Sequence, residues 1–113
     1  YYFSNRENDL FIDLSRIYWK IRFEKSGLID FIEKEFLNPV IIVFGSLAKA
    51  ETKSDSDIDL AVFTATNKQI NLKKFSNVLK KEIHLFVFKK REDVGNKELL
   101  NNILNGYKLT GDW

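Results

Sequence analysis

The stretch that decides the fold is Val40-Ile41-Ile42-Val43-Phe44-Gly45-Ser46, followed ten residues later by Asp57-Ile58-Asp59. Five consecutive apolar residues before Gly45 are typical of a strand that is buried on both faces. A second apolar run begins at the two aspartates and continues to Phe63. The sequence therefore predicts two strands, 40–44 and 58–63, joined by a polar loop.

The two aspartates are expected to share one face of the second strand. On a β-strand, residues i and i+2 point the same way, so Asp57 and Asp59 lie together while Ile58 and Leu60 point into apolar packing. Two neighbouring carboxylates repel each other, and a cation relieves that repulsion. Because Mg²⁺ favours one or two carboxylates together with substrate phosphates, the pair predicts a magnesium site.

Gly45 and Ser46 follow the first strand and suit a phosphate group. Gly45 lets the backbone approach a triphosphate, and Ser46 adds an N–H and a hydroxyl at an expected helix start. The simpler interpretation is a tight strand-to-helix turn, and the two interpretations are compatible. Metal ligands beside a phosphate cradle suggest nucleotidyl transfer.

The run Phe44-Gly45-Ser46-Leu47-Ala48-Lys49-Ala50, with Ser56-Asp57-Ile58-Asp59-Leu60, resembles the signature of the polymerase beta nucleotidyltransferase superfamily. It is most similar to the small prokaryotic minimal nucleotidyltransferase branch, over residues 39–113. The resemblance implies an α/β (α+β) fold with a short mixed β-sheet and helices packed on it. It also implies Mg²⁺-dependent transfer of a nucleoside monophosphate, AMP from ATP, to a hydroxyl of a protein or other acceptor. Small members of this branch often act as antitoxins that modify a HEPN-type toxin, which is therefore the expected partner.

The third metal ligand is the weakest part of the resemblance. The family uses three acids, and the third lies on a following strand, here 82–88. His84 stands where that pattern has Asp, and Glu82 lies two residues earlier on the same face. We expect Glu82 to complete the metal site, with His84 as the alternative and only one of them level with the aspartates. Otherwise Glu82 is a surface acid and His84 a half-buried strand residue facing the helices.

Two further residues are expected in the nucleotide site from the resemblance. Lys49 stands where this branch usually carries Arg, so it keeps the charge but loses two-point phosphate binding. Ser56 would orient the Asp57 carboxylate by a hydrogen bond. The alternatives are an ordinary surface lysine and a residue that merely starts the strand.

Other ligand motifs fit the pattern less well. The series Asp55-x-Asp57-x-Asp59 imitates the start of a calcium loop, but Leu60 stands where glycine is required and Thr66 where the distal Glu is required. A P-loop is excluded because no Gly-Lys-Ser/Thr follows Gly45 at the right distance. Two exposed carboxylates that cap turns or protect an edge strand would leave the Gly-Ser turn unexplained.

Composition bounds the class of protein. The chain has 113 residues, 44% of them hydrophobic, and no cysteine, which suits one domain without disulfides or thiolate metal sites. Net charge is +2, from 18 basic and 16 acidic residues, too balanced to indicate nucleic-acid binding. No apolar run is long enough for a membrane span and no secretory signal is visible, so a cytoplasmic location is expected. The chain opens at Tyr1 and has no Met, as expected for part of a longer protein.

We predict a single domain over 1–113, with helices in 1–38 and the motif-bearing sheet in 39–113. Helical spacing predicts a first helix that ends near Gly27, a second that ends before Asn38, a third after residue 71, and a fourth over 97–105. A short last strand is expected over 107–109. The apolar residues of the first helix, with Tyr18, Trp19 and Phe23, are expected in the core, and any exposed members would form a dimer or partner face.

A second candidate function is a catalytically degenerate nucleotidyltransferase fold. The main reason to consider it is His84, which stands where the family pattern has Asp. Such a domain would serve as a ligand-sensing or protein-binding module, attached to a DNA-binding segment upstream.

Overall fold

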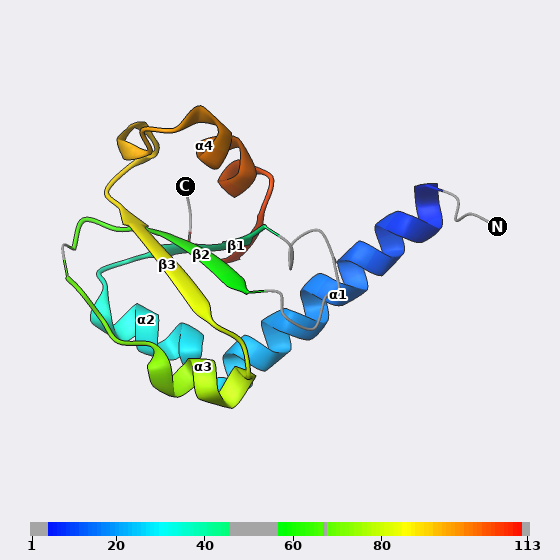
Figure 1. Cartoon of the computed structure of the whole chain (residues 1–113), viewed down its shortest axis with the longest axis horizontal. Helices are drawn as coiled ribbons and strands as arrows, with labels where there is room; N and C mark the ends of the chain where they lie inside the picture. Colours follow the sequence, from blue (N-terminus) through cyan, green and yellow to red (C-terminus); the bar gives the residue numbers. More distant parts are fainter. Residues whose placement is uncertain (1–4, 46–56, 67, 112–113) are drawn as a thin grey trace.

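The strands form one mixed sheet. The computed structural model describes residues 5–45, 57–66 and 68–111. Within them the sheet has four strands in the order β3-β2-β1-β4. The strands are β1 (Val40–Phe44), β2 (Ile58–Phe63), β3 (Ile83–Phe88) and β4 (Tyr107–Thr110). β1 is antiparallel to β2 and β4, whereas β2 and β3 are parallel, so the predicted mixed sheet is confirmed (Figure 1).

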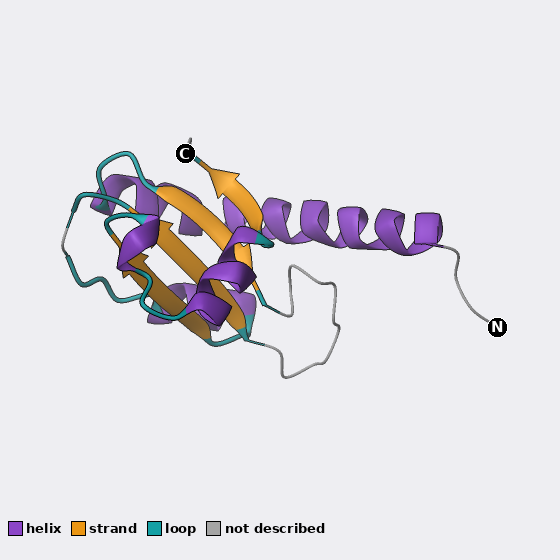
Figure 2. Cartoon of the chain, turned by 90° about the horizontal axis from the view of Figure 1, so that it is seen from above, coloured by secondary structure: helices purple, strands orange, loops and turns teal. Residues whose placement is uncertain are grey.

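Helices cover both faces of this sheet. They are α1 (Asn5–Ser26), α2 (Leu28–Glu35), α3 (Lys73–Leu79) and α4 (Lys97–Leu104), with a short 3₁₀ turn at Arg91–Asp93. α2, α3 and the C-terminal part of α1 pack on one face, and α4 packs on the other (Figures 1 and 2). The rest of α1 extends beyond the sheet. None of the described helices is long and apolar enough to cross a bilayer.

The central strand β1 is apolar throughout because each of its faces meets a separate core. Ile41 and Val43 belong to the core under α1, α2 and α3. Val40, Ile42 and Phe44 belong to the core under α4. All five side chains are buried, as expected for a strand covered on both faces.

The boundary between α1 and α2 is set by Gly27. Its φ of 85° lies in the left-handed region, which glycine adopts without steric cost. Its N–H donates to the carbonyl oxygen of Glu24 at 3.1 Å and closes the end of α1. The predicted helix end at this position is confirmed.

Several apolar positions are exposed, and those of α1 differ from the expectation of a core position: Leu10, Leu14, Ile17 and Ile21 lie in solvent. Val78 of α3 and Leu104 of α4 are exposed as well. In α1, Phe23 is fully buried and Trp19 packs against the same core, but Tyr18 is 55% exposed. The expectation that Tyr18 lies in the core is therefore wrong.

Candidate active site

The predicted site residues come together where β2 and β3 begin. Because these strands are parallel, their starts lie at the same edge of the sheet. Asp59 pairs with His84 in the register. One step earlier, the N–H of Ile58 donates to the carbonyl oxygen of Glu82 at 2.8 Å, so Asp57 and Glu82 are also neighbours.

The two aspartates lie on the face of β2 opposite its main core. Ile58 and Leu60 are fully buried in the core under α1, α2 and α3. The alternation of a strand then directs Asp57 and Asp59 to the other face, where Ala61 and Phe63 further along β2 pack under α4. The predicted alternation of carboxylates and apolar side chains is what the structure has.

Three potential ligands form a compact group. Asp57 Oδ2 lies 2.9 Å from His84 Nε2. One ligand atom each from Asp57, Glu82 and His84 can be chosen so that all three lie within 4.8 Å of one another. The expectation that only one of Glu82 and His84 would be level with the aspartates is wrong, since both approach Asp57. The side chain of His84 is 43% exposed, so solvent reaches this corner of the group.

Asp59 lies against the end of β1. Phe44 pairs with Asp59 in the register, and Gly45 follows with a φ of 75°. A Cβ atom built on Gly45 would stand 2.5 Å from Asp59 Oδ2. Glycine is therefore required here both for its backbone conformation and to leave room for the carboxylate.

The electrostatics of the group reflect crowded acids. Partial burial raises the pKa of Asp59 above its ordinary 3.8; the nearby His84 opposes this shift and the Asp57 carboxylate adds to it. The hydrogen bond that protonated His84 donates to the Asp57 carboxylate raises the pKa of His84 above 6.5. Burial opposes this shift, and the charges of Asp57, Asp59 and Glu82 add to it. A cation would relieve the repulsion between these carboxylates, as His84 does in part when it is protonated.

The donor set fits a divalent cation. The carboxylates of Asp57 and Glu82 offer the oxygen ligands that Mg²⁺ prefers, with Asp59 beside them. The imidazole of His84 is a poorer ligand for Mg²⁺ and a better one for softer transition-metal ions. The carboxylate oxygens can thus hold a metal, and the imidazole nitrogen of His84 lies beside them.

Three expected nucleotide-binding residues lie outside the described part of the chain. They are Ser46, Lys49 and Ser56, and their roles stay predictions. Gly45 is described and stands beside Asp59, at the edge where the acidic group lies.

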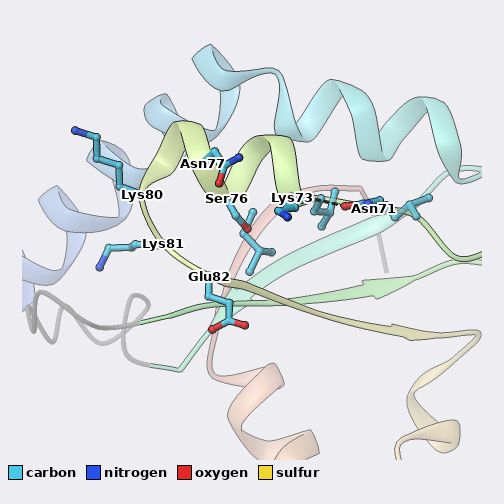
Figure 3. Close-up of a pocket in the computed structure, with 10 residues that line it drawn as sticks. Asn71, Lys73, Ser76, Asn77, Lys80, Lys81 and Glu82 are labelled. Carbon is cyan, nitrogen blue, oxygen red and sulfur yellow. Dashed lines mark hydrogen bonds between the residues drawn. The ribbon is translucent and has the colours of Figure 1, made fainter.

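A basic pocket lies on the other side of Glu82, between α3 and the start of β3. Its volume is about 920 Å³, and Lys73, Lys80 and Lys81 are among its lining residues. Glu82 also lines this pocket, and in Figure 3 its carboxylate points away from α3. The sequence shows these lysines only as short basic runs, typical of solvated surfaces, and only the packing of α3 on β3 gathers them.

The hydrogen bond between Asp57 and His84 can be tested by titration. His84 is the only histidine, so its ring signals in an NMR spectrum are unambiguous. In the metal-free protein we expect it to titrate above pH 6.5, and Asp57→Asn should bring its pKa back toward that value. Because the folded-state pKa is raised, the stabilisation from protonated His84 is full below pH 6.5 and is lost as the pH rises through the folded-state pKa.

The companion measurement is the same titration with Mg²⁺. A bound cation should lower the apparent pKa of His84, because it repels the imidazolium and competes for Asp57. A His84 pKa of 6.5 or lower in the wild-type protein, or one that Asp57→Asn leaves unchanged, would contradict the hydrogen bond.

The chain is similar to known proteins in sequence pattern and in fold. Residues 27–109 match the family model described as polymerase beta, nucleotidyltransferase, and a search of curated proteins gives no match. A solved structure described as a toxin-antitoxin with AMP-PNP is 20% identical, with a TM-score of 0.58 over 82% of this chain and 73% of that one. A mutant of the toxin-antitoxin MntA-HpeT is 19% identical, with a TM-score of 0.56 over 75% of this chain and 70% of that one. At such identities the likeness to these two structures is one of fold.

Proposed function

This chain belongs to the polymerase beta nucleotidyltransferase family, and on that premise we propose that it transfers AMP from ATP to a hydroxyl group of a protein acceptor, with Mg²⁺ as its cofactor. The observation that supports this proposal most is the meeting of Asp57, Glu82 and His84 within 4.8 Å. Asp59 and Gly45 stand beside this group, as a metal site next to a triphosphate requires.

In this reaction the acceptor oxygen forms a bond to the α-phosphorus, the bond between the α- and β-phosphates breaks, and pyrophosphate leaves. When bound, a divalent metal would lower the pKa of the acceptor hydroxyl and neutralise charge on the leaving phosphates. We assign the metal ligands to the carboxylates of Asp57, Asp59 and Glu82. We assign the hydroxyl proton to Glu82, whose carboxylate is exposed and free to exchange it with solvent.

The remaining residues would orient the reactants. Gly45 lets the triphosphate approach the backbone, and Ser46 and Lys49 are proposed to bind its phosphates. Ser56 is proposed to orient Asp57. The hydrogen bond of His84 to Asp57 would hold that carboxylate in one rotamer until the metal binds.

A HEPN-type toxin is the acceptor we propose. The resemblance of the motif to antitoxin nucleotidyltransferases supports it, and so does the likeness of the fold to two toxin-antitoxin structures, one of them with AMP-PNP. The direct test is transfer of label from ATP carrying a radioactive α-phosphate to a purified HEPN-type toxin, with Mg²⁺ or with chelator. We expect the toxin to be labelled in the reaction with Mg²⁺ and not in the reaction with chelator. If neither reaction labels the toxin, the proposed acceptor is wrong.

The separate roles of Glu82 and His84 can be distinguished by substitution. Glu82→Gln should lower transfer by about 100-fold, because it removes a metal ligand and the proton acceptor together. His84→Ala should leave most of the transfer. His84→Asp should raise transfer with Mg²⁺ more than with Mn²⁺, because an oxygen ligand replaces an imidazole that suits Mg²⁺ poorly.

The matched control is Glu98→Gln, which removes an exposed acid of α4 outside the group and should leave transfer unchanged. If Glu82→Gln has no effect and His84→Asp brings no gain, neither residue completes the site. The second candidate function would then be preferred, a ligand-sensing or protein-binding module without transfer. The observation that favours this second function is His84 opposite Asp59, where the family carries a third acid.

A further inference from the structure

One side of α1 carries large apolar side chains that the rest of the described chain leaves in solvent. Leu10, Leu14, Ile17 and Ile21 are 59%, 56%, 51% and 45% exposed. An exposed apolar row of this size marks an interaction surface. Figures 1 and 2 show that the N-terminal part of α1 extends away from the sheet.

The row has the spacing of a coiled-coil seam. Its members follow one another at intervals of four, three and four residues, which is the a and d pattern of a heptad. At 1.5 Å per residue the row is about 17 Å long. Trp19 and Phe23 lie on the other side of α1 and pack against the main core, so they attach the helix while the seam faces outward.

The charged residues beside the seam select a partner and an orientation. With Leu14 and Ile21 at a positions, Asp13 and Lys20 occupy successive g positions. Two antiparallel helices bring g positions together, so Asp13 of one copy would meet Lys20 of the other, twice about a two-fold axis. Two parallel copies would instead bring Lys20 toward Lys25, which is repulsive.

This helix is also separate from the part that defines the family. The family match covers residues 27–109, and α1 ends at Ser26. A helix that extends into solvent is marginally stable by itself and gains stability from packing its apolar side. The seam on α1 therefore lies outside the residues that the family model matches.

We propose that α1 is a dimerisation helix that pairs antiparallel with α1 of a second copy of this chain. Leu14 of one copy packs on Ile17 of the other, and Leu10 packs on Ile21. The two pairs of Asp13 and Lys20 flank this seam. The proposal does not depend on nucleotidyl transfer, because it rests on residues outside the candidate active site.

The first test is the oligomeric state of the whole chain by analytical ultracentrifugation across a wide range of concentrations. We expect a monomer–dimer equilibrium. Leu14→Glu with Ile17→Glu should weaken the dimer by at least about 30-fold, because it removes the central layers of the seam. Since both positions are exposed, the double variant should have the near-ultraviolet circular dichroism spectrum and the Mg²⁺ affinity of the wild type.

The second test reads the orientation from charge. Asp13→Lys or Lys20→Asp alone should each weaken the dimer, because each places like charges opposite one another at two places. The double swap should restore the wild-type affinity. Lys25→Asp is the matched control, since it changes net charge as much as Lys20→Asp and lies outside the proposed antiparallel charge pairs.

Three outcomes overturn the proposal. If the chain sediments as a monomer at every concentration, α1 does not pair with a second copy, and a different protein would be the partner of the seam. A dimer that survives Leu14→Glu with Ile17→Glu would use another surface. A dimer that Lys20→Asp strengthens, or that does not respond to either charge change, would not have the antiparallel arrangement.

Discussion

Replacement of Asp57 and Asp59 together by Asn should abolish the Mg²⁺-dependent part of ATP binding while the fold stays intact. Both carboxylates lie at the start of β2 on the face away from the main core, so their loss removes ligands and no apolar packing. We expect at least a 100-fold weaker affinity for ATP in the presence of Mg²⁺, because even partners outside the first ligand shell contribute about 10–100-fold to metal affinity. Isothermal titration calorimetry with Mg²⁺ and with chelator measures the difference.

The same variant should be as stable as the wild type, or more stable, when no metal is present. The pKa of Asp59 is raised above 3.8, chiefly by burial. A carboxyl with a raised pKa costs stability as the pH rises from its ordinary value of 3.8 through the raised pKa, and the cost is full above that pKa. An uncharged Asn removes this cost at neutral pH. In the wild type, Mg²⁺ at 100 times its dissociation constant should add about 2.7 kcal/mol to the free energy of unfolding, and the variant should lack this gain.

The matched control is Glu92→Gln with Asp93→Asn, which removes two neighbouring, exposed acids outside the acidic group. Its ATP affinity should be that of the wild type under both conditions. Equal affinity for ATP in the wild type and in the variant of Asp57 and Asp59, with and without Mg²⁺, would refute the metal assignment.

Gly45→Ala should lower transfer nearly as much as the loss of Asp59, although it changes no charged or polar side chain. The new methyl group would stand 2.5 Å from Asp59 Oδ2, and the φ of 75° is one that alanine rarely adopts. The carboxylate must move, and the backbone conformation costs about 1–2 kcal/mol in a residue with a Cβ atom. We expect transfer to fall by about 100-fold and the free energy of unfolding to fall by about that conformational cost.

Gly95→Ala is the control for this substitution, because a Cβ at Gly95 meets nothing within 4 Å. It should leave transfer unchanged and be neutral or slightly stabilising in thermal unfolding, because alanine restricts the unfolded chain. Full transfer by Gly45→Ala would mean that Asp59 does not need its present position against the end of β1.

Much of the fold could be predicted from local pattern. The bounds of β1 and β2 are those expected, because continuous apolar runs between polar or turn-forming residues leave little freedom for a strand to slip. The end of α1 at Gly27 follows from the left-handed conformation that glycine adopts without strain. The shared face of Asp57 and Asp59 follows from the two-residue repeat of a strand.

The rest of the candidate site could not be predicted, because it depends on pairing between distant segments. The sequence places Glu82 and His84 on one face of a strand. It does not say which of them lies beside Asp57, because that depends on the register between the two strands. The parallel register sets His84 opposite Asp59 and Glu82 beside Asp57, so that both reach one group. The gathering of Lys73, Lys80 and Lys81 around one pocket likewise depends on how α3 packs on β3.

The first helix shows the same division between sequence and structure. Its apolar spacing determines by itself that α1 is a helix with apolar sides, since residues three and four apart lie together on a helix. The spacing does not say what covers each side, because a core and a partner helix select the same residue types. Only the tertiary structure shows that Phe23 is buried in the main core while Leu14 and Ile17 face solvent, because the core covers the side of α1 that carries Trp19 and Phe23 and leaves the opposite side open.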